Sequence, residues 1–177
     1  MKSSGMITAF YLGQASDSAG RSIEDIWSFS DYLLESVHDY IQWLFPLQEP
    51  SRFNAAAPTL DDQTIQEFRH NPELRKRLLR SFKLMLGFYG FQLPQAGYKI
   101  QISKNQDYAV KKANWLNWGN HNYLRITRIL TSLNLLGLPE HSRAFLDCLE
   151  QVYSEEREGI GESTIRYWRA TARFAED

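Results

Sequence analysis

The sequence is short of several features that would assign a function or a compartment directly. It has one cysteine among 177 residues, Cys148, so it forms no internal disulfide and offers no cysteine spacing typical of a metal site. It contains no apolar run of 18 residues, and we therefore expect no transmembrane helix. The opening segment, MKSSGMITAF, has too short an apolar stretch for a secretory signal. Together these absences predict a cytoplasmic protein without a bound metal.

The sequence also lacks the common enzyme signatures. It has no phosphate-binding P-loop, no glycine-rich dinucleotide turn, no HExxH zinc motif and no GxSxG nucleophile motif. Cys148 falls at an apolar position of an expected helix, which is a poor environment for a nucleophile. We therefore expect no cofactor and favour a binding function over catalysis. The alternative is an enzyme that uses histidine and arginine for acid–base or phosphoryl chemistry.

Apolar and aromatic residues are plentiful enough for one folded domain over residues 1–177. The composition is 43% hydrophobic and 23% charged, and a chain of 177 residues can bury about 70% of its unfolded surface. Aromatic residues make up 14% of the chain, with five Trp and ten Phe. This content predicts thick aromatic interfaces between helices or an aromatic-lined groove.

Charge is distributed unevenly, although the net charge is only −1. Residues 1–70 hold 4 Lys or Arg and 10 Asp or Glu, a local charge of −6. Residues 71–134 hold 11 Lys or Arg and 2 Asp or Glu, a local charge of +9. The remaining residues, 135–177, carry −4. The basic middle segment either packs against the acidic flanks or forms a surface for an anionic ligand. A nucleic-acid partner is not expected, because such a protein is usually basic overall.

Capping signals and helical periodicity cover most of the chain. The segments Ser22–Asp25 and Thr59–Asp62 both have the form of a capping box. Asn71 and Pro72 place an N-cap before a proline at the first helical position. We predict helices over residues 22–34, 35–45, 59–70, 72–89, 107–117, 121–136, 139–153 and 162–175.

The segment near residues 91–106 is the least helical part of the sequence. Pro94 and Gly97 interrupt it, and residues 98–102 alternate between apolar and polar side chains as a short strand does. We expect an irregular loop or a short ribbon there. The predicted fold class is all-α, a compact bundle of seven or eight helices.

Two helical segments carry polar groups that a buried helix does not need. The first is HDYIQWLFPLQEP over residues 38–50, and the second is HNYLRITRIL over residues 121–130. In the second segment, spacings of three and four place His121, Arg125 and Arg128 on one helix face. Because an unpaired buried charge costs several kcal/mol, these arginines must either pair with acids of the flanks or face a ligand.

The functional interpretation of both segments is a ligand site. Guanidinium groups suit carboxylate or phosphate, and the helix N-terminus near residues 120–122 would add backbone donors. In the first segment, a histidine and a glutamine lie four residues apart, and the tryptophan could line a peptide groove. The alternative is that all of these groups serve the core. The candidate ligand-binding residues are His38, Gln42, Trp43, His121, Asn122, Tyr123, Arg125 and Arg128.

The two segments together resemble the conserved domain of the opioid growth factor receptor family. Further matches are Phe10-Tyr11-Leu12, Phe88-Tyr89-Gly90 and Ala113-Asn114-Trp115, so that the resemblance spans residues 7–175. Vertebrate members are described as enkephalin receptors with a nuclear or perinuclear location. The resemblance implies a non-enzymatic module that recognises a peptide or a protein. The alternative partner is an anionic small molecule or a nucleotide bound by the histidine and arginine groups.

Overall fold

A computed structural model describes residues 5–94 and 99–172 of the chain. These residues form eleven helices and one two-stranded sheet, which confirms the all-α class predicted from the sequence. The chain divides into two compact units, residues 1–81 and 82–177, and the boundary falls within helix α6. Across the described ranges, no helix is both long enough and apolar enough to span a membrane.

The first unit consists of five short helices and the first part of α6. Its core is built from aromatic rings: Tyr11 lies edge-on to Phe68, and Phe10 contacts Trp43, each pair with its ring centroids 5.1 Å apart. The Tyr11 hydroxyl donates to the carbonyl of Leu44 at 2.5 Å and so connects α1 to α4. The helices are α1 (Met6–Tyr11), α2 (Ile23–Trp27), α3 (Asp31–Ser36), α4 (Ile41–Leu44), α5 (Asp62–His70) and α6 (Pro72–Tyr89).

The region predicted as two helices, residues 22–34 and 35–45, instead forms the three short helices α2, α3 and α4, so that this prediction is wrong. Ser30 is extended, and its hydroxyl accepts the backbone N–H of Leu33 at 3.4 Å as the N-cap of α3. Val37 is also extended and ends that helix. Serine side chains offer the backbone an alternative to continued helix, which explains the break before α3.

One of the two predicted capping boxes is present. The Ser22 hydroxyl accepts the backbone N–H of Asp25 at 3.1 Å, and the Asp25 carboxylate accepts the backbone N–H of Ser22 at 2.8 Å. At α5, however, the N-cap is Asp61 and not Thr59, because the Asp61 carboxylate accepts the backbone N–H of Thr64 at 2.8 Å. A carboxylate adjacent to the first helical turn therefore begins this helix two residues later than predicted.

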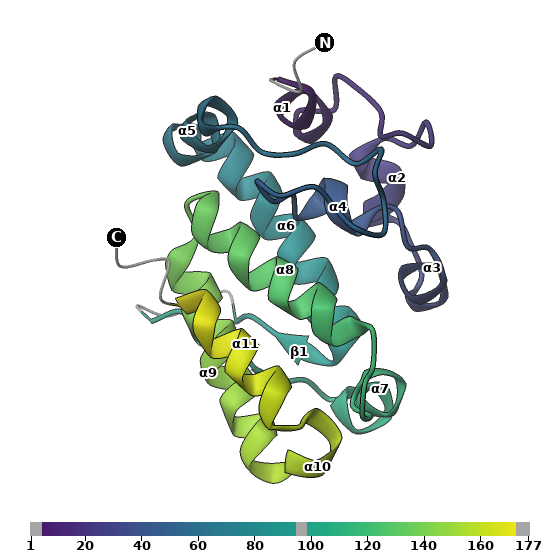
Figure 1. The fold of residues 1–177 in the computed structure, drawn as a ribbon, viewed down its shortest axis with the longest axis vertical. Coiled ribbons are helices and arrows are strands. Elements are labelled where there is room, and N and C mark those ends of the chain that lie inside the picture. The colour runs from purple at the N-terminus through teal and green to yellow at the C-terminus, as the bar shows by residue number, and fades with distance from the viewer. Residues whose placement is uncertain (1–4, 95–98, 173–177) are drawn as a thin grey trace. The chain divides into compact units, whose positions relative to one another are not determined.

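The second unit is organised around α8. This helix packs against α9 and α11, and the three lie side by side in Figure 1. The amide of Asn134 donates to the carbonyl of Thr171 at 2.9 Å, and the hydroxyl of Ser142 donates to the carbonyl of Leu130 at 2.9 Å. The elements are β1 (Phe91–Gln92), β2 (Ser103–Lys104), α7 (Tyr108–Trp115), α8 (Asn122–Leu135), α9 (Pro139–Glu155), α10 (Arg157–Ile160) and α11 (Glu162–Thr171).

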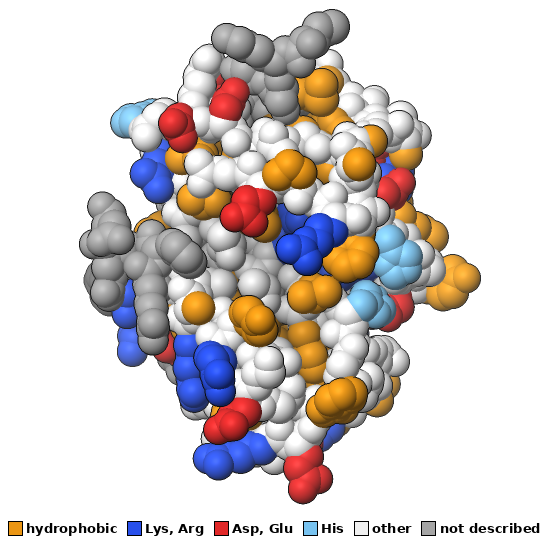
Figure 2. Space-filling view, in the orientation of Figure 1, with side chains coloured by type: hydrophobic (Ala, Val, Ile, Leu, Met, Phe, Trp, Pro, Cys, Tyr) orange, Lys and Arg blue, Asp and Glu red, His pale blue; other side chains and the backbone are white. Residues whose placement is uncertain are grey.

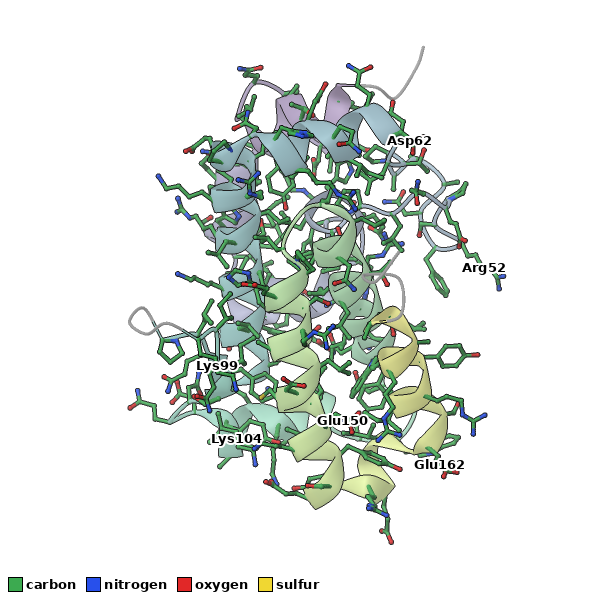
Figure 3. All side chains as sticks on the ribbon, turned by 90° about the vertical axis from the view of Figure 1, so that its left-hand side faces the viewer. Arg52, Asp62, Lys99, Lys104, Glu150 and Glu162 are labelled. Atoms are coloured by element: carbon green, nitrogen blue, oxygen red, sulfur yellow. The ribbon has the colours of Figure 1, made fainter. Side chains whose placement is uncertain are left out.

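An ion pair on the surface of the second unit joins α9 to α11. Arg169 donates through Nε and Nη2 to the two carboxylate oxygens of Glu150 at 2.6 and 2.8 Å. Figure 3 shows Glu150 on α9, beside α11. The hydrogen bonds from Arg169 hold the pKa of Glu150 below its usual range. The contribution of this exposed pair to stability is modest, because water screens both groups.

The ribbon predicted near residues 91–106 is present, but its strands differ from the predicted one. Phe91 pairs with Lys104 in an antiparallel register, whereas residues 99–102 form no strand and Tyr98 lies outside the described residues. Gly90, at φ 90°, turns the chain into this ribbon, and a Cβ there would lie 2.8 Å from the Cα of Tyr108. Glycine is therefore required where α6 ends.

The long helices were predicted with nearly correct bounds. Helices α6, α8 and α9 match their predicted ranges to within two residues, and α11 begins where predicted; residues 173–175 of its range lie outside the described residues. Two short helices, α1 and α10, were not predicted, and neither has a capping side chain. These helices, with the division of residues 22–45 into three, raise the number from the expected seven or eight to eleven among the described residues.

Replacing Ser22 with alanine should lower the free energy of unfolding by about 1 kcal/mol, because the variant loses the capping box of α2. Urea unfolding followed by circular dichroism measures the change. Ser16→Ala, which alters an exposed serine of the preceding loop, is the control. Equal stability of the two variants would contradict the assigned cap.

Candidate functional site

The candidate residues of the first signature segment lie around α4 in the first unit. His38 is exposed, whereas Gln42 and Trp43 are 5% and 2% exposed. The Gln42 side chain donates to the carbonyl of His38 at 3.3 Å and accepts from the amide of Asn54 at 3.5 Å. Trp43 packs on Phe10. Gln42 thus holds the chain before α4 against the loop near Asn54, and His38 is the residue of this set that presents its side chain to solvent.

The candidate residues of the second segment lie at the start of α8, in the second unit. Asn122 is fully buried and is central to a polar network. Its side-chain oxygen lies 3.5 Å from the hydroxyl of Tyr89 and 3.5 Å from Nη1 of Arg125, which is itself 6% exposed. Its amide group donates to the side chain of Asn120 at 3.0 Å. The structure therefore brings Asn122 and Arg125 together inside the unit.

The N-terminus of α8, which the sequence suggested as a source of backbone donors, is already occupied in part. The side chain of Asn120 accepts the backbone N–H of Asn122 at 2.9 Å, and its carbonyl accepts the backbone N–H of Tyr123 at 3.1 Å. These bonds satisfy two of the free donors of the first turn. An anion at this helix end would have to compete with them.

Tyr123 joins α8 to the elements around it. Its ring lies edge-on to Trp115 and to Trp168, with centroid separations of 6.5 and 5.6 Å. Its hydroxyl donates to the carbonyl of Gly159 at 2.7 Å, and its own carbonyl accepts the indole N–H of Trp168 at 3.2 Å. Burial raises the pKa of Tyr123 to about 12. Tyr123 therefore acts as a neutral hydrogen-bond donor that connects α8 to the segment before α11.

The two remaining candidates of this segment are the more accessible ones. His121 is exposed at the N-cap position of α8, and Arg128 is half-buried one turn beyond Arg125. Burial lowers the pKa of Arg128 from its ordinary value. Of the eight candidate residues, three therefore belong to the first unit and five to the second, where α8 carries four and His121 precedes it.

Three exposed apolar residues next to the Tyr123 network were missed by the sequence analysis. Trp118, Leu124 and Tyr167 are 83%, 61% and 67% exposed. Leu124 directly follows Tyr123 in the chain, and Tyr167 directly precedes Trp168, whose indole N–H donates to the Tyr123 carbonyl. The indole nitrogen of Trp118 lies near Gly161, at the start of α11. We call these three residues the apolar face. Periodicity places Leu124 on α8, but it gives no signal that this side of the helix is left uncovered.

Cys148 does not offer a nucleophile. It is 4% exposed within α9, and burial raises the pKa of its thiol to about 12. No cluster of three or more His, Cys, Asp or Glu side chains suited to a metal ion occurs in the part of the chain that the structure describes. The arrangement found in the second unit is a buried polar network beneath an exposed apolar face.

The family model of the opioid growth factor receptor conserved region matches residues 5–177. The chain belongs to the opioid growth factor receptor family. The resemblance noted in the two signature segments is thus confirmed over nearly the whole sequence. No solved structure matches this family member.

The relatives of this family member are much longer proteins. The opioid growth factor receptor of Homo sapiens is 42% identical over 162 residues, which cover 87% of this chain and 23% of the human protein. The receptor of Rattus norvegicus is 40% identical over a match that covers 87% of this chain and 27% of the rat protein. The opioid growth factor receptor-like protein 1 of Xenopus tropicalis is 35% identical over a match that covers 87% of this chain and 30% of the Xenopus protein. The chain thus spans less than a third of the length of each of these relatives.

In this family member, the Cys148 thiol should react slowly with Ellman's reagent. At pH 8 we expect the folded protein to react more than about 100-fold more slowly than the protein in urea, because burial both covers the thiol and raises its pKa. The rate should increase with pH toward 12. A rate in the folded state equal to that of the unfolded chain would show that the thiol is accessible.

Proposed function

We propose that this domain is a non-enzymatic binding module that recognises a peptide or a protein segment through apolar side chains. The observation that carries the proposal is the apolar face of Trp118, Leu124 and Tyr167. Large apolar side chains that stay exposed on a folded protein are typical of interaction sites. Figure 2 shows hydrophobic side chains over α11 and the start of α8 on the face that it presents.

The residues beneath the apolar face support this role, because they give it a fixed base. Tyr123, Trp115 and Trp168 form a buried aromatic column, and the hydrogen bonds of Tyr123 tie the column to Gly159. Binding energy concentrates on anchors whose positions are set before the ligand arrives, since less side-chain freedom is then lost. A peptide that inserts an apolar side chain between Leu124 and its neighbours would use this base.

The predicted ligand-binding residues take two roles in the proposal. Asn122, Tyr123 and Arg125 position the start of α8 from inside the unit, whereas His121 and Arg128 lie at the accessible side and contact the ligand. His38, Gln42 and Trp43 belong to the first unit, and in the proposal His38 is a separate contact point on that unit. The relatives are named receptors, which supports ligand recognition as the function of the family. A cytoplasmic location fits the single buried cysteine.

A second candidate function, the binding of an anionic small molecule, is favoured by one observation. Burial lowers the pKa of Arg128, so that its charge is held partly away from water, and His121 and Arg125 lie on neighbouring turns of the same helix. A bound phosphate would offset this desolvation. The experiments below separate this candidate from peptide recognition.

Selection from a displayed peptide library tests peptide recognition. We expect selected peptides to carry aromatic or aliphatic anchors and to bind Leu124→Ala and Trp118→Ala at least about tenfold more weakly than the wild type, because the anchors lose their contacts. Val110→Ala is the matched control, since Val110 on α7 is 76% exposed. The melting temperature should stay within about 2 °C in all three variants. The proposal fails if the library yields no binder, or if the three variants bind equally.

A thermal-shift series with inorganic phosphate and simple nucleotides tests the anion candidate. A ligand at about 100 times its Kd raises stability by about 2.7 kcal/mol, and the shift should shrink as salt rises and vanish in Arg128→Gln. A flat series would exclude an anion site on α8 and would leave the peptide-binding proposal unaffected.

A further inference from the structure

The start of α6 concentrates positive charge within an acidic unit. Residues 1–81 hold eight Lys or Arg and eleven Asp or Glu, a net charge of −3. Half of the basic residues lie within six consecutive positions of α6. They are Arg75, Lys76, Arg77 and Arg80.

Two of these four side chains are used to hold the unit together. Arg75 donates to the carbonyl of Phe68 at 3.1 Å and so binds the end of α5. Arg77 donates to the carbonyl of Tyr11 and forms an ion pair with Glu24. Both guanidinium groups therefore act on the interior of the unit, and neither is available as a ligand group.

Arg80 is different, because it is exposed and yet held in place. Its guanidinium carbon lies 4.1 Å from the ring centroid of Trp27, within the range of a cation–π contact. The indole N–H of Trp27 donates to the hydroxyl of Ser81 at 2.9 Å, and Ser81 is fully buried. The ring is thus anchored in the unit, and it in turn orients Arg80 while leaving the N–H donors of the fork at the surface.

No carboxylate of residues 5–94 or 99–172 lies within ion-pair distance of Arg80. The charge of Arg80 nevertheless acts on Glu24. Burial raises the pKa of the Glu24 carboxyl, but Arg77 and Arg80 lower it, and the pKa lies below its usual range. Lys76 lies one turn earlier on the same side of α6, with its side chain 79% exposed and a distant contact of 3.8 Å to Glu73. Two cations are therefore presented side by side.

We propose that Lys76 and Arg80 form a docking site for a short acidic peptide segment of a partner protein, with the Arg80 fork binding a carboxylate of that segment. A planar guanidinium binds carboxylate in a bidentate manner, and its stack on Trp27 reduces the side-chain freedom lost on binding. Lys76 adds a second charge one helical turn away, within reach of the next acidic residue of an extended peptide.

The charge of the surroundings favours a short peptide over a longer polyanion. A nucleic acid or an anionic membrane surface requires many cations, of the order of four to eight for a lipid surface, and gains affinity from each of them. Here two cations stand in a unit whose net charge is −3. A long polyanion would meet further acids beyond Lys76 and Arg80, whereas a short acidic segment meets fewer of them. The site lies in the first unit and does not depend on the apolar face.

Fluorescence anisotropy with a fluorescein-labelled octapeptide of alternating Asp and Gly tests the proposal on the whole chain at low ionic strength. Arg80→Gln should weaken binding at least about tenfold, and Arg80→Lys should restore only part of the affinity, because lysine keeps the charge but not the fork. Arg166→Gln is the matched control: Arg166 is another exposed arginine, on α11, and its loss changes the net charge equally. Circular dichroism should show the same helical content in all variants, since both sites are exposed.

Three results would overturn the proposal. The first is the absence of binding by the wild-type chain. The second is an equal loss of affinity in Arg80→Gln and Arg166→Gln, which would indicate attraction to the overall charge. The third is tighter, Arg80-dependent binding of a 20-residue oligothymidylate or of phosphatidylserine vesicles, which would assign the surface to a polyanion.

Discussion

The enclosure of α8 is the constraint on which the second unit depends. This helix buries apolar side chains on most of its circumference, so that α9 and α11 must both pack against it before its surface is removed from water. A helix buried on several sides cannot send its polar groups to solvent. The side-chain oxygen of Asn122 consequently accepts from both Arg125 and Tyr89, and Asn134 and Ser132 are buried as well. Asn122 and Arg125 of the signature segment are therefore part of the packing of the unit.

The same constraint explains which structural features the sequence revealed. The long helices show apolar periodicity over several turns, and their bounds were predicted nearly correctly. The prediction of two helices over residues 22–45 was wrong, because serine caps and extended residues such as Val37 compete with helix over a few positions. Elements this short are decided by tertiary packing. The prediction of a strand over 98–102 was wrong for a related reason: the residues that pair with Phe91 and Gln92 are Lys104 and Ser103, and local alternation does not specify which residues pair.

For the candidate site, the sequence identified residue types and helix faces but not their exposure. The spacing of His121, Arg125 and Arg128 is correct for a helix, yet Arg125 is buried and His121 is exposed. Nothing in the local pattern of Leu124 or Tyr167 distinguishes them from core residues. The exposure of a side chain depends on which other elements pack around it. The side of α8 that α9 and α11 leave uncovered can be identified only when all three helices are in place.

The position of the unit boundary has a consequence for how the chain can be divided. Helix α6 runs from Pro72 to Tyr89, and the boundary after Ser81 leaves ten of its residues in the first unit and eight in the second. Isolated helices shorter than about 12–15 residues are marginal in water. A protein fragment that ended at this boundary, or one that began there, would therefore carry a short piece of α6 that frays. Helix α6 is one continuous element, and cutting the chain after Ser81 would divide it into two short pieces.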